Sequence, residues 1–292
     1  MRFRDFCQNF PVAQEDWPLV RPSKVIPMHW REVLYARMGS ILAASDRSRA
    51  KSSSRLGVSL RPYQAGDRLA TLSLPHMMRA DELLSRVDEA PGQFAARIFV
   101  ITTESLQFRS DYSSCTKGQV ALGIAGLIEA VHLRQNQSVR VIYCTREQLE
   151  TQIVFHLHPQ FAGAAVSVVS DFLDKSLEHD LIALKQSNIQ TAALYCVRDA
   201  LEEAVTANPL GDLALELDAP AQTAPPPARR TFSGKKYVNN LLIERELYER
   251  AARDAHCRLR FVTETEELFN VVKTVTDSYA LARFALQPTA PA

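Results

Sequence analysis

Short apolar runs alternate with segments of helical periodicity from about residue 97 onward, and this alternation restricts the fold more than any other feature of the chain. The continuous apolar run at residues 98–101 is typical of a strand that is covered on both faces. Residues 117–134 then place apolar side chains at helical spacing, namely Val120, Ile124, Leu127 and Val131. Strands separated by helices in this way predict an α/β fold with a doubly wound, mostly parallel sheet and helices on both faces.

The same patterns locate the remaining elements. Further strands are predicted at residues 139–144, 152–157, 164–169, 189–197, 213–217 and 258–262. Helices are predicted at residues 30–44, 175–187, around Leu201, at 239–256 and from Glu264 onward.

The ends and joints of the chain have a different composition. Residues 1–27 contain four prolines and are interpreted as an extended arm, whereas the polar and basic residues 45–55 indicate an exposed loop. We therefore expect a small N-terminal α+β segment over residues 1–92 and a sheet domain over residues 93–292. A Pro/Ala linker is predicted at residues 219–230 of the sheet domain.

Charge and hydropathy exclude several classes of protein. Lys and Arg number 34 against 33 Asp and Glu, a net charge of +1, which argues against a nucleic-acid binder that neutralises phosphates. No run approaches the roughly 18–20 apolar residues of a membrane span, and the N-terminus lacks the apolar run of a signal peptide. Cys144 and Cys196 lie inside apolar runs, as expected for thiols packed in a reducing compartment. The sequence predicts a cytoplasmic protein with no direct membrane span and no nucleic-acid partner.

A set of segments in fixed order carries a more specific signal. Residues 61–67 read Arg-Pro-Tyr-Gln-Ala-Gly-Asp, with Arg61, Tyr63, Gly66 and Asp67 at an Arg-x-Tyr-x-x-Gly-Asp spacing, and Arg79 follows. Next come the strand at 98–103 with its turn, Ser-Asp-Phe at 170–172, Asp199 with Glu202, and the C-terminal strand and helix. In this order the segments resemble the DUF58 family, whose core is a von Willebrand factor A-like domain, over roughly residues 55–275.

The first of these segments also has an interpretation that is independent of the family. Gly66 and Asp67 form a turn dipeptide that tolerates positive φ, and Arg61 and Tyr63 on one strand face are placed to brace that turn. We interpret the segment as a structural hairpin clamp and not as a catalytic motif. The resemblance assigns Arg79, Asp199 and Glu202 to the same structural signature.

The resemblance further implies a divalent-cation site at the carboxyl edge of the sheet, where such folds bind ligands. Its ligand positions transfer to Thr103, Ser105 and Gln107 in the first loop and to Asp171 in a later loop. Mg²⁺ prefers oxygen ligands that include one or two carboxylates, yet Thr103 and Gln107 stand where the family has an aspartate and a second serine. The sequence therefore predicts a degenerate site without a metal or another cofactor, with Mg²⁺ on Ser105 and Asp171 as the alternative.

The surroundings of this site support the metal-free interpretation. Glu104 would face away from Ser105 on an extended segment, because neighbouring residues point to opposite sides. The segment between Cys144 and Ser170 leaves little room for a crossover helix and the loop that would carry a threonine ligand. Asp171 is interpreted as an N-cap or turn residue of the helix predicted at 175–187.

Two other patterns suggest chemistry. His156 and His158 would lie on the same side of the strand predicted at 152–157, a spacing that can bind Zn²⁺ with a third ligand. A solvent-facing pair at a strand end is the interpretation we favour. Lys117-Gly118 opens a helix, where an anion can bind, but we favour the interpretation of a helix start after a polar loop.

No acid, base and nucleophile are assembled by these patterns, so we expect a non-catalytic protein-interaction or adaptor module. The resemblance implies a MoxR-type AAA+ ATPase as the protein partner, in protein-complex maturation or a stress response. It also implies a docking surface at residues 103–112 and 171–174. The alternatives are a metal-assisted hydrolase that uses His156, His158 and Asp171, and a purely structural scaffold.

Overall fold

The computed structural model describes residues 2–53, 60–62, 84–86, 95–156, 165–172, 192–207, 234–255 and 257–285. Several sequence predictions lie outside these residues: the helix at 175–187, the strand at 213–217, the linker at 219–230, and the positions of Tyr63, Gly66, Asp67 and Arg79. Arg61 lies in β1 (Leu60–Pro62), which pairs with β2 (Leu84–Arg86) in a separate two-stranded antiparallel sheet.

The main sheet has five strands, and all of its pairings are parallel, as the alternating pattern predicts. They are β3 (Ala96–Ile101), β4 (Val139–Cys144), β5 (Ala165–Ser170), β6 (Ala192–Val197) and β7 (Arg258–Val262). Their spatial order is β4-β3-β5-β6-β7. The chain therefore adds β4 on one side of β3 and every later strand on the other, so the direction of winding reverses between β3 and β5.

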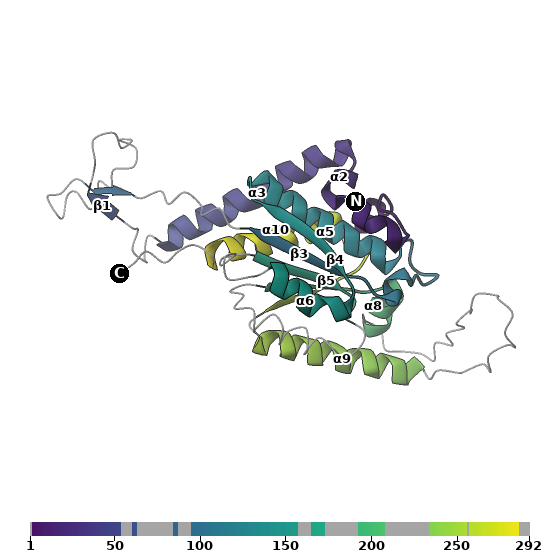
Figure 1. The fold of residues 1–292 in the computed structure, drawn as a ribbon. Helices are drawn as coiled ribbons and strands as arrows, with labels where there is room; N and C mark the ends of the chain where they lie inside the picture. Colours follow the sequence, from purple (N-terminus) through teal and green to yellow (C-terminus); the bar gives the residue numbers. More distant parts are fainter. Residues whose placement is uncertain are drawn as a thin grey trace, which may run out of the picture.

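Helices cover both faces of the sheet (Figure 1). On one face, α5 (Lys117–Arg134) and α10 (Leu268–Ala285) pack with the sheet into one hydrophobic core. On the other, Leu149 of α6 (Arg146–His156) and Tyr248 of α9 (Gly234–Asp254) join a second core with the opposite side chains of the strands. The short helix α8 (Ala200–Ala207) follows β6. A doubly wound α/β sheet is the result.

The prediction of a strand at 152–157 is wrong, because residues 152–156 belong to α6. At the start of the helix the Thr145 N–H donates to the Gln148 side-chain oxygen Oε1 at 3.1 Å. Such a Thr-x-x-Gln capping pair stabilises a helix start, and Leu149 then packs into the core. The apolar run at 153–155 therefore continues a helix, and the connection from β4 to β5 does accommodate a crossover helix.

The prediction of an extended arm at residues 1–27 is also wrong. This N-terminal segment folds into α1 (Phe3–Cys7), the 3₁₀-helix η1 (Gln14–Leu19) and α2 (Pro22–Val25). Its aromatic side chains are buried in the same core as α5 and α10, namely Phe3, Phe6, Phe10 and Trp17. The following helix, α3 (Met28–Ser53), packs against α10 and α5 and includes most of the basic segment expected to be a loop. Residues 45–53 contain neither Gly nor Pro, so nothing in the backbone ends the helix earlier.

Helix α5 lies between the sheet and the N-terminal segment, and it is buried from Lys117 to His132. Three of its glycines face the N-terminal segment closely. A Cβ atom at Gly118 would lie 2.6 Å from the Trp17 ring, one at Gly123 would lie 2.9 Å from Cys7 Sγ, and one at Gly126 would lie 3.2 Å from the Pro22 carbonyl oxygen. A helix that is apolar on all sides must be buried on all sides. The glycines of α5 allow the N-terminal segment to approach the helix backbone closely.

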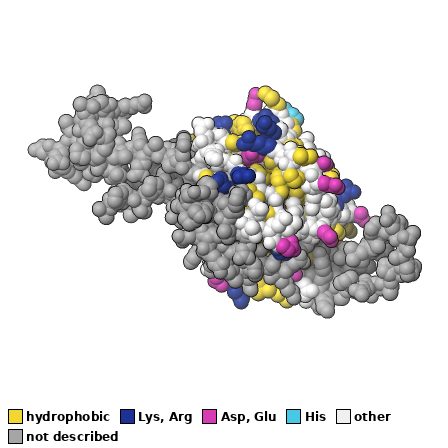
Figure 2. All heavy atoms as spheres, in the orientation of Figure 1, with side chains coloured by type: hydrophobic (Ala, Val, Ile, Leu, Met, Phe, Trp, Pro, Cys, Tyr) yellow, Lys and Arg dark blue, Asp and Glu magenta, His cyan; other side chains and the backbone are white. Residues whose placement is uncertain are grey.

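No helix in the described part of the chain is long and apolar enough to cross a bilayer. Side chains of both charge signs are interspersed with apolar ones on the face seen in Figure 2.

The burial of His132 predicts a pH-dependent stability. His132 is 3% exposed, and burial lowers its pKa from 6.5 to about 4, against the opposing effect of the hydrogen bond with Gln137. Below pH 6.5 the unfolded chain therefore binds a proton that the folded chain excludes. We expect the free energy of unfolding to fall by up to about 3 kcal/mol between pH 6.5 and pH 4 from this group alone.

Urea denaturation at both pH values measures this change. His132→Phe keeps a ring against Tyr279, which His132 contacts edge-to-face, and is expected to lose most of the fall. His29→Phe removes an exposed histidine, keeps His132, and serves as the matched control. Equal pH dependence in wild type and His132→Phe would contradict the expectation.

Candidate functional site

The carboxyl ends of β3 and β5 flank the point where the winding reverses, and this is where open α/β sheets bind their ligands. Thr103 follows β3 and Asp171 follows β5 directly. Because β3 and β5 are paired neighbours, the two loops meet at one edge of the sheet. The fold therefore brings together two positions that are 68 residues apart in the chain.

Three of the four predicted metal-site positions converge here. The Thr103 and Ser105 hydroxyl oxygens are 2.9 Å apart, and Thr103 Oγ1 donates to Asp171 Oδ1 at 3.4 Å. Gln107, the fourth position, is exposed at the end of the 3₁₀-helix η3 (Glu104–Gln107), and Glu104 is also exposed. Asp171 is completely buried, and its Oδ2 atom has no hydrogen-bond partner among the described residues.

This donor set fits a divalent cation only in part. It offers hard oxygen atoms, which Mg²⁺ prefers, and the unpaired Asp171 Oδ2 is available as a ligand atom. However, the set contains one carboxylate and two neutral hydroxyls, so a bound Mg²⁺ would keep half of its charge uncompensated. Nowhere in the described ranges do three or more His, Cys, Asp or Glu side chains gather as a metal site would require.

A second polar cluster lies beside the first and is centred on Asp199, at the end of β6. The Asp199 carboxylate accepts hydrogen bonds from the Ser110 N–H at 3.1 Å and from both the Ser110 and Ser113 hydroxyls. It also accepts from the Leu201 N–H at 2.8 Å, while the Asp199 N–H donates to Glu202 Oε2 at 2.9 Å. Asp199 and Glu202 thus cap α8 and at the same time hold the loop that follows η3.

Two further carboxylates complete the attachment of this loop. Glu202 accepts from Lys117 Nζ at 2.7 Å in a buried ion pair. Glu264, after β7, accepts from the backbone N–H groups of Ser114 and Cys115, each at 2.7 Å. Asp199, Glu202 and Glu264 thus each bond to a backbone N–H group or to a buried side chain of this loop and of the start of α5.

The outer residues of the same loop are left to solvent. We call residues 108–112 the carboxyl-edge loop. Its exposed side chains include two aromatic residues, Phe108 at 39% and Tyr112 at 68%, together with Arg109 and Asp111. Buried hydrogen bonds to Asp199 hold the backbone of this loop, so its exposed side chains are held in a defined position relative to the sheet.

Sequence reasoning missed Ser110, Ser113, Lys117 and Glu264 as members of this cluster. The Asp-x-x-Glu spacing of Asp199 and Glu202 is a recognisable helix-start signal. No local signal indicates which loop the Asp199 carboxylate bonds, because Ser110 lies 89 residues away.

The thiols at this edge have raised pKa values, and the described serine hydroxyls bond to neighbouring polar groups. Burial, followed by the nearby Glu264, raises the pKa of the Cys115 thiol to about 12. Burial likewise raises the pKa of Cys196 to about 12, so both thiols stay protonated near neutral pH. In the described part of the chain, the hydroxyls of Ser105, Ser110 and Ser113 bond to carboxylates or other hydroxyls and not to a histidine.

The histidine pair proposed for a hydrolase does not have the geometry assumed for it. His156 is the last residue of helix α6 and not a strand residue. His158 lies outside the described residues. The same-side strand spacing on which the Zn²⁺ alternative rested is therefore absent at His156.

No protein-family model matches the chain, and neither a curated protein nor a solved structure matches it. What the protein does is therefore inferred from its fold and from the geometry of this edge.

Proposed function

We propose that this protein is a non-catalytic interaction module that docks a protein partner on the carboxyl edge of its sheet. The core is proposed to be von Willebrand factor A-like, as in the DUF58 family that the sequence resembles. The parallel, doubly wound sheet with polar loops at its winding reversal supports this assignment.

The observation that carries the proposal is the carboxyl-edge loop itself. Residues 110–115 are attached to the body of the protein by five hydrogen bonds, three to Asp199 and two to Glu264. Aromatic residues and arginine are the residues that most often dominate the energy of protein interfaces. Phe108, Arg109 and Tyr112 are all exposed on this rigid base. A preorganised loop loses little conformational entropy on binding, which favours docking.

The partner proposed is a MoxR-type AAA+ ATPase, which the family resemblance implies. Docking is proposed not to need a metal ion. The Thr103 hydroxyl already donates to Asp171, and the single carboxylate provides little charge for Mg²⁺. Shape, hydrogen bonds and apolar contact at the carboxyl-edge loop then provide the affinity.

A binding experiment tests both statements. Tyr112→Ala is expected to weaken binding to the purified MoxR-type ATPase of the same genome by about tenfold or more, the loss typical of a central interface aromatic. The melting temperature should remain close to that of wild type, because the Tyr112 side chain is mostly exposed. Ile243→Ala, which removes an exposed apolar side chain from α9, is the matched control and should bind normally.

The same titration in EDTA and in Mg²⁺ tests the role of the ion. Equal affinity under both conditions is expected. Binding that EDTA abolishes and Mg²⁺ restores would contradict metal-free docking, and normal binding by Tyr112→Ala would contradict the assignment of the surface.

A further inference from the structure

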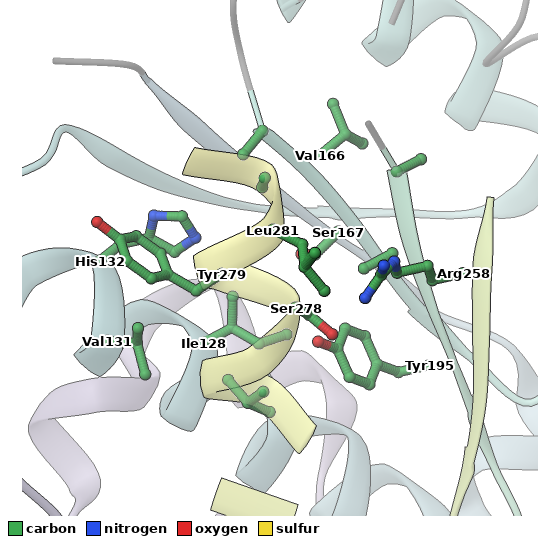
Figure 3. A pocket seen from close by; sticks show the side chains of 15 residues that line it. Ile128, Val131, His132, Val166, Ser167, Tyr195, Arg258, Ser278, Tyr279 and Leu281 are labelled. Carbon is green, nitrogen blue, oxygen red and sulfur yellow. The ribbon is translucent and has the colours of Figure 1, made fainter. Parts of the chain in front are cut away.

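A cavity of about 210 Å³ lies at the opposite edge of the sheet from the carboxyl-edge loop (Figure 3). Its floor consists of the first residues of β5, β6 and β7, and its walls are the C-terminal halves of α5 and α10. The cavity is thus separate from the proposed docking surface, and the proposed function does not use it.

The cavity exists because the strands carry small side chains at this end. Ala165 and Ser167 of β5 and Ala193 of β6 line it. Further along the same sheet face, Val169 lies two residues after Ser167 and Val197 lies four residues after Ala193, and both are buried in the core. Side chains two apart on a strand share a face, so the change from small to large residues leaves a hollow beneath α5 and α10.

Three kinds of polar group open onto this mostly apolar space. Ser167 is more than nine-tenths buried and lines the cavity. The hydroxyls of Tyr195 and Ser278 lie side by side (Figure 3) and interact. Burial raises the pKa of Tyr195 to about 12, so its hydroxyl keeps its proton and can donate.

The third polar group is the guanidinium of Arg258. It projects from the first residue of β7 toward the same space (Figure 3). Arg258 is exposed, which places its charge at the mouth of the cavity. The register pairs Ser167 with Ala193 and Ala193 with Arg258, so the three side chains form one row across neighbouring strands.

The charge of this lining has one sign. Arg258 is the charged side chain among the described lining residues, and no carboxylate is among them. His132 also lines the cavity, but burial lowers its pKa to about 4 and keeps it neutral at pH 7. Among the described lining residues, an anionic group at the mouth would therefore meet a cation and no carboxylate.

We propose that this cavity binds a small apolar monocarboxylate, with its hydrocarbon part between α5, α10 and the sheet and its carboxylate at Arg258. Ligand pockets commonly combine an apolar lining with a few polar groups that orient the ligand. A cavity of about 150 Å³ holds benzene, so this cavity has room for an aromatic ring and a carboxylate. Benzoate is the matching probe.

Calorimetric titration with benzoate tests the proposal on the full chain. Saturable binding is expected in wild type. Arg258→Gln is expected to weaken it at least about tenfold, because a charge-assisted hydrogen bond is lost. Arg260→Gln is the matched control: Arg260 lies on the same face of β7 but does not line the cavity, and this variant should bind as wild type does.

A second variant and a second probe separate the pocket from nonspecific attraction to arginine. Ala193→Leu places a larger side chain in the cavity and is expected to abolish binding while circular dichroism remains that of a folded chain. Toluene, which lacks the carboxylate, should bind at least about tenfold more weakly than benzoate. No saturation by benzoate at millimolar concentration, equal binding by Arg258→Gln, or equal affinity for toluene would each overturn the proposal.

Discussion

Replacing Trp17 with alanine is expected to lower the free energy of unfolding by about 3–5 kcal/mol, the range for removal of a large aromatic from a core. Trp17 is fully buried although it lies in a short 3₁₀-helix that contains Pro18. Its ring lies against Gly118 of α5 and 6.3 Å from the Tyr143 ring, measured between centroids. Its indole N–H donates to the Pro11 carbonyl oxygen at 3.3 Å. The substitution leaves a cavity over α5 that backbone atoms cannot readily fill.

Urea denaturation at pH 7 measures this effect, with Leu19→Ala as the matched control. Leu19 belongs to the same short helix but is 85% exposed, so its truncation should change stability by less than about 0.5 kcal/mol. A loss below about 1 kcal/mol in Trp17→Ala would contradict the structure, because it would mean that the N-terminal segment is not part of the core.

Lys117→Met is expected to destabilise the protein by a similar amount, about 3–5 kcal/mol. The Lys117 ammonium and the Glu202 carboxylate form an ion pair at 2.7 Å, with side chains only 2% and 6% exposed. Removing the lysine charge leaves the Glu202 carboxylate buried without its partner, and an uncompensated buried charge is costly. Methionine keeps most of the side-chain volume, so the expected loss comes from the charge and not from a cavity.

The double variant Lys117→Met/Glu202→Gln distinguishes these causes. Glutamine keeps an oxygen that can accept from the Asp199 N–H, as Glu202 Oε2 does in the wild type, but it carries no charge. Replacing both ions together is often close to neutral, so the double variant should regain most of the stability lost in Lys117→Met. A double variant as unstable as the single one would show that the effect is not electrostatic.

These two predictions concern opposite sides of the carboxyl edge of the sheet. Gln14 of the N-terminal segment donates from Nε2 to the Thr103 carbonyl oxygen at 2.7 Å, which ties the segment to the first loop of the candidate site. Lys117 lies below the carboxyl-edge loop, with Nζ 5.5 Å from the centre of the Phe108 ring. Under the proposed function, loss of the Gln14 contact or of the Lys117 contact is expected to weaken partner docking indirectly, whereas Tyr112→Ala is expected to change docking without changing stability.

Local periodicity was sufficient for the central elements. The apolar runs at 98–101, 139–144 and 258–262 are strands, and residues 117–134 form a helix with the predicted bounds. These elements combine a strong pattern with burial that the pattern directly reflects. The prediction at 152–157 failed because Ile, Val and Phe favour strands locally, while the capping pair at Thr145 and Gln148 and the packing of Leu149 favour a helix.

The role of the N-terminal segment was not readable from its own residues. Its prolines suggest an extended chain, and its buried aromatics are meaningful only because α5 offers an apolar outer surface with glycines at the points of contact. The sequence did indicate that α5 is apolar on every side, and such a helix must be buried both by the sheet and by a second layer of chain. Glu129, which interrupts that apolar segment, pairs with Arg21 and the Ser23 N–H of the same cover.

By itself, the sequence determined the α/β class, most of the strands, and the identity of Thr103, Ser105 and Asp171 as residues of one edge. The class and the strands follow from side-chain periodicity, whereas Thr103, Ser105 and Asp171 were indicated by the resemblance to the DUF58 family, which implies a site at the carboxyl edge of the sheet. Only the tertiary structure decided that Asp199 and Glu264 anchor the carboxyl-edge loop, that residues 2–27 cover α5, and that a cavity lies beneath Arg258. Each of these features depends on contacts between residues that are far apart in the chain. Hydrogen bonding and close packing depend on distance in space, and local sequence patterns do not contain that information.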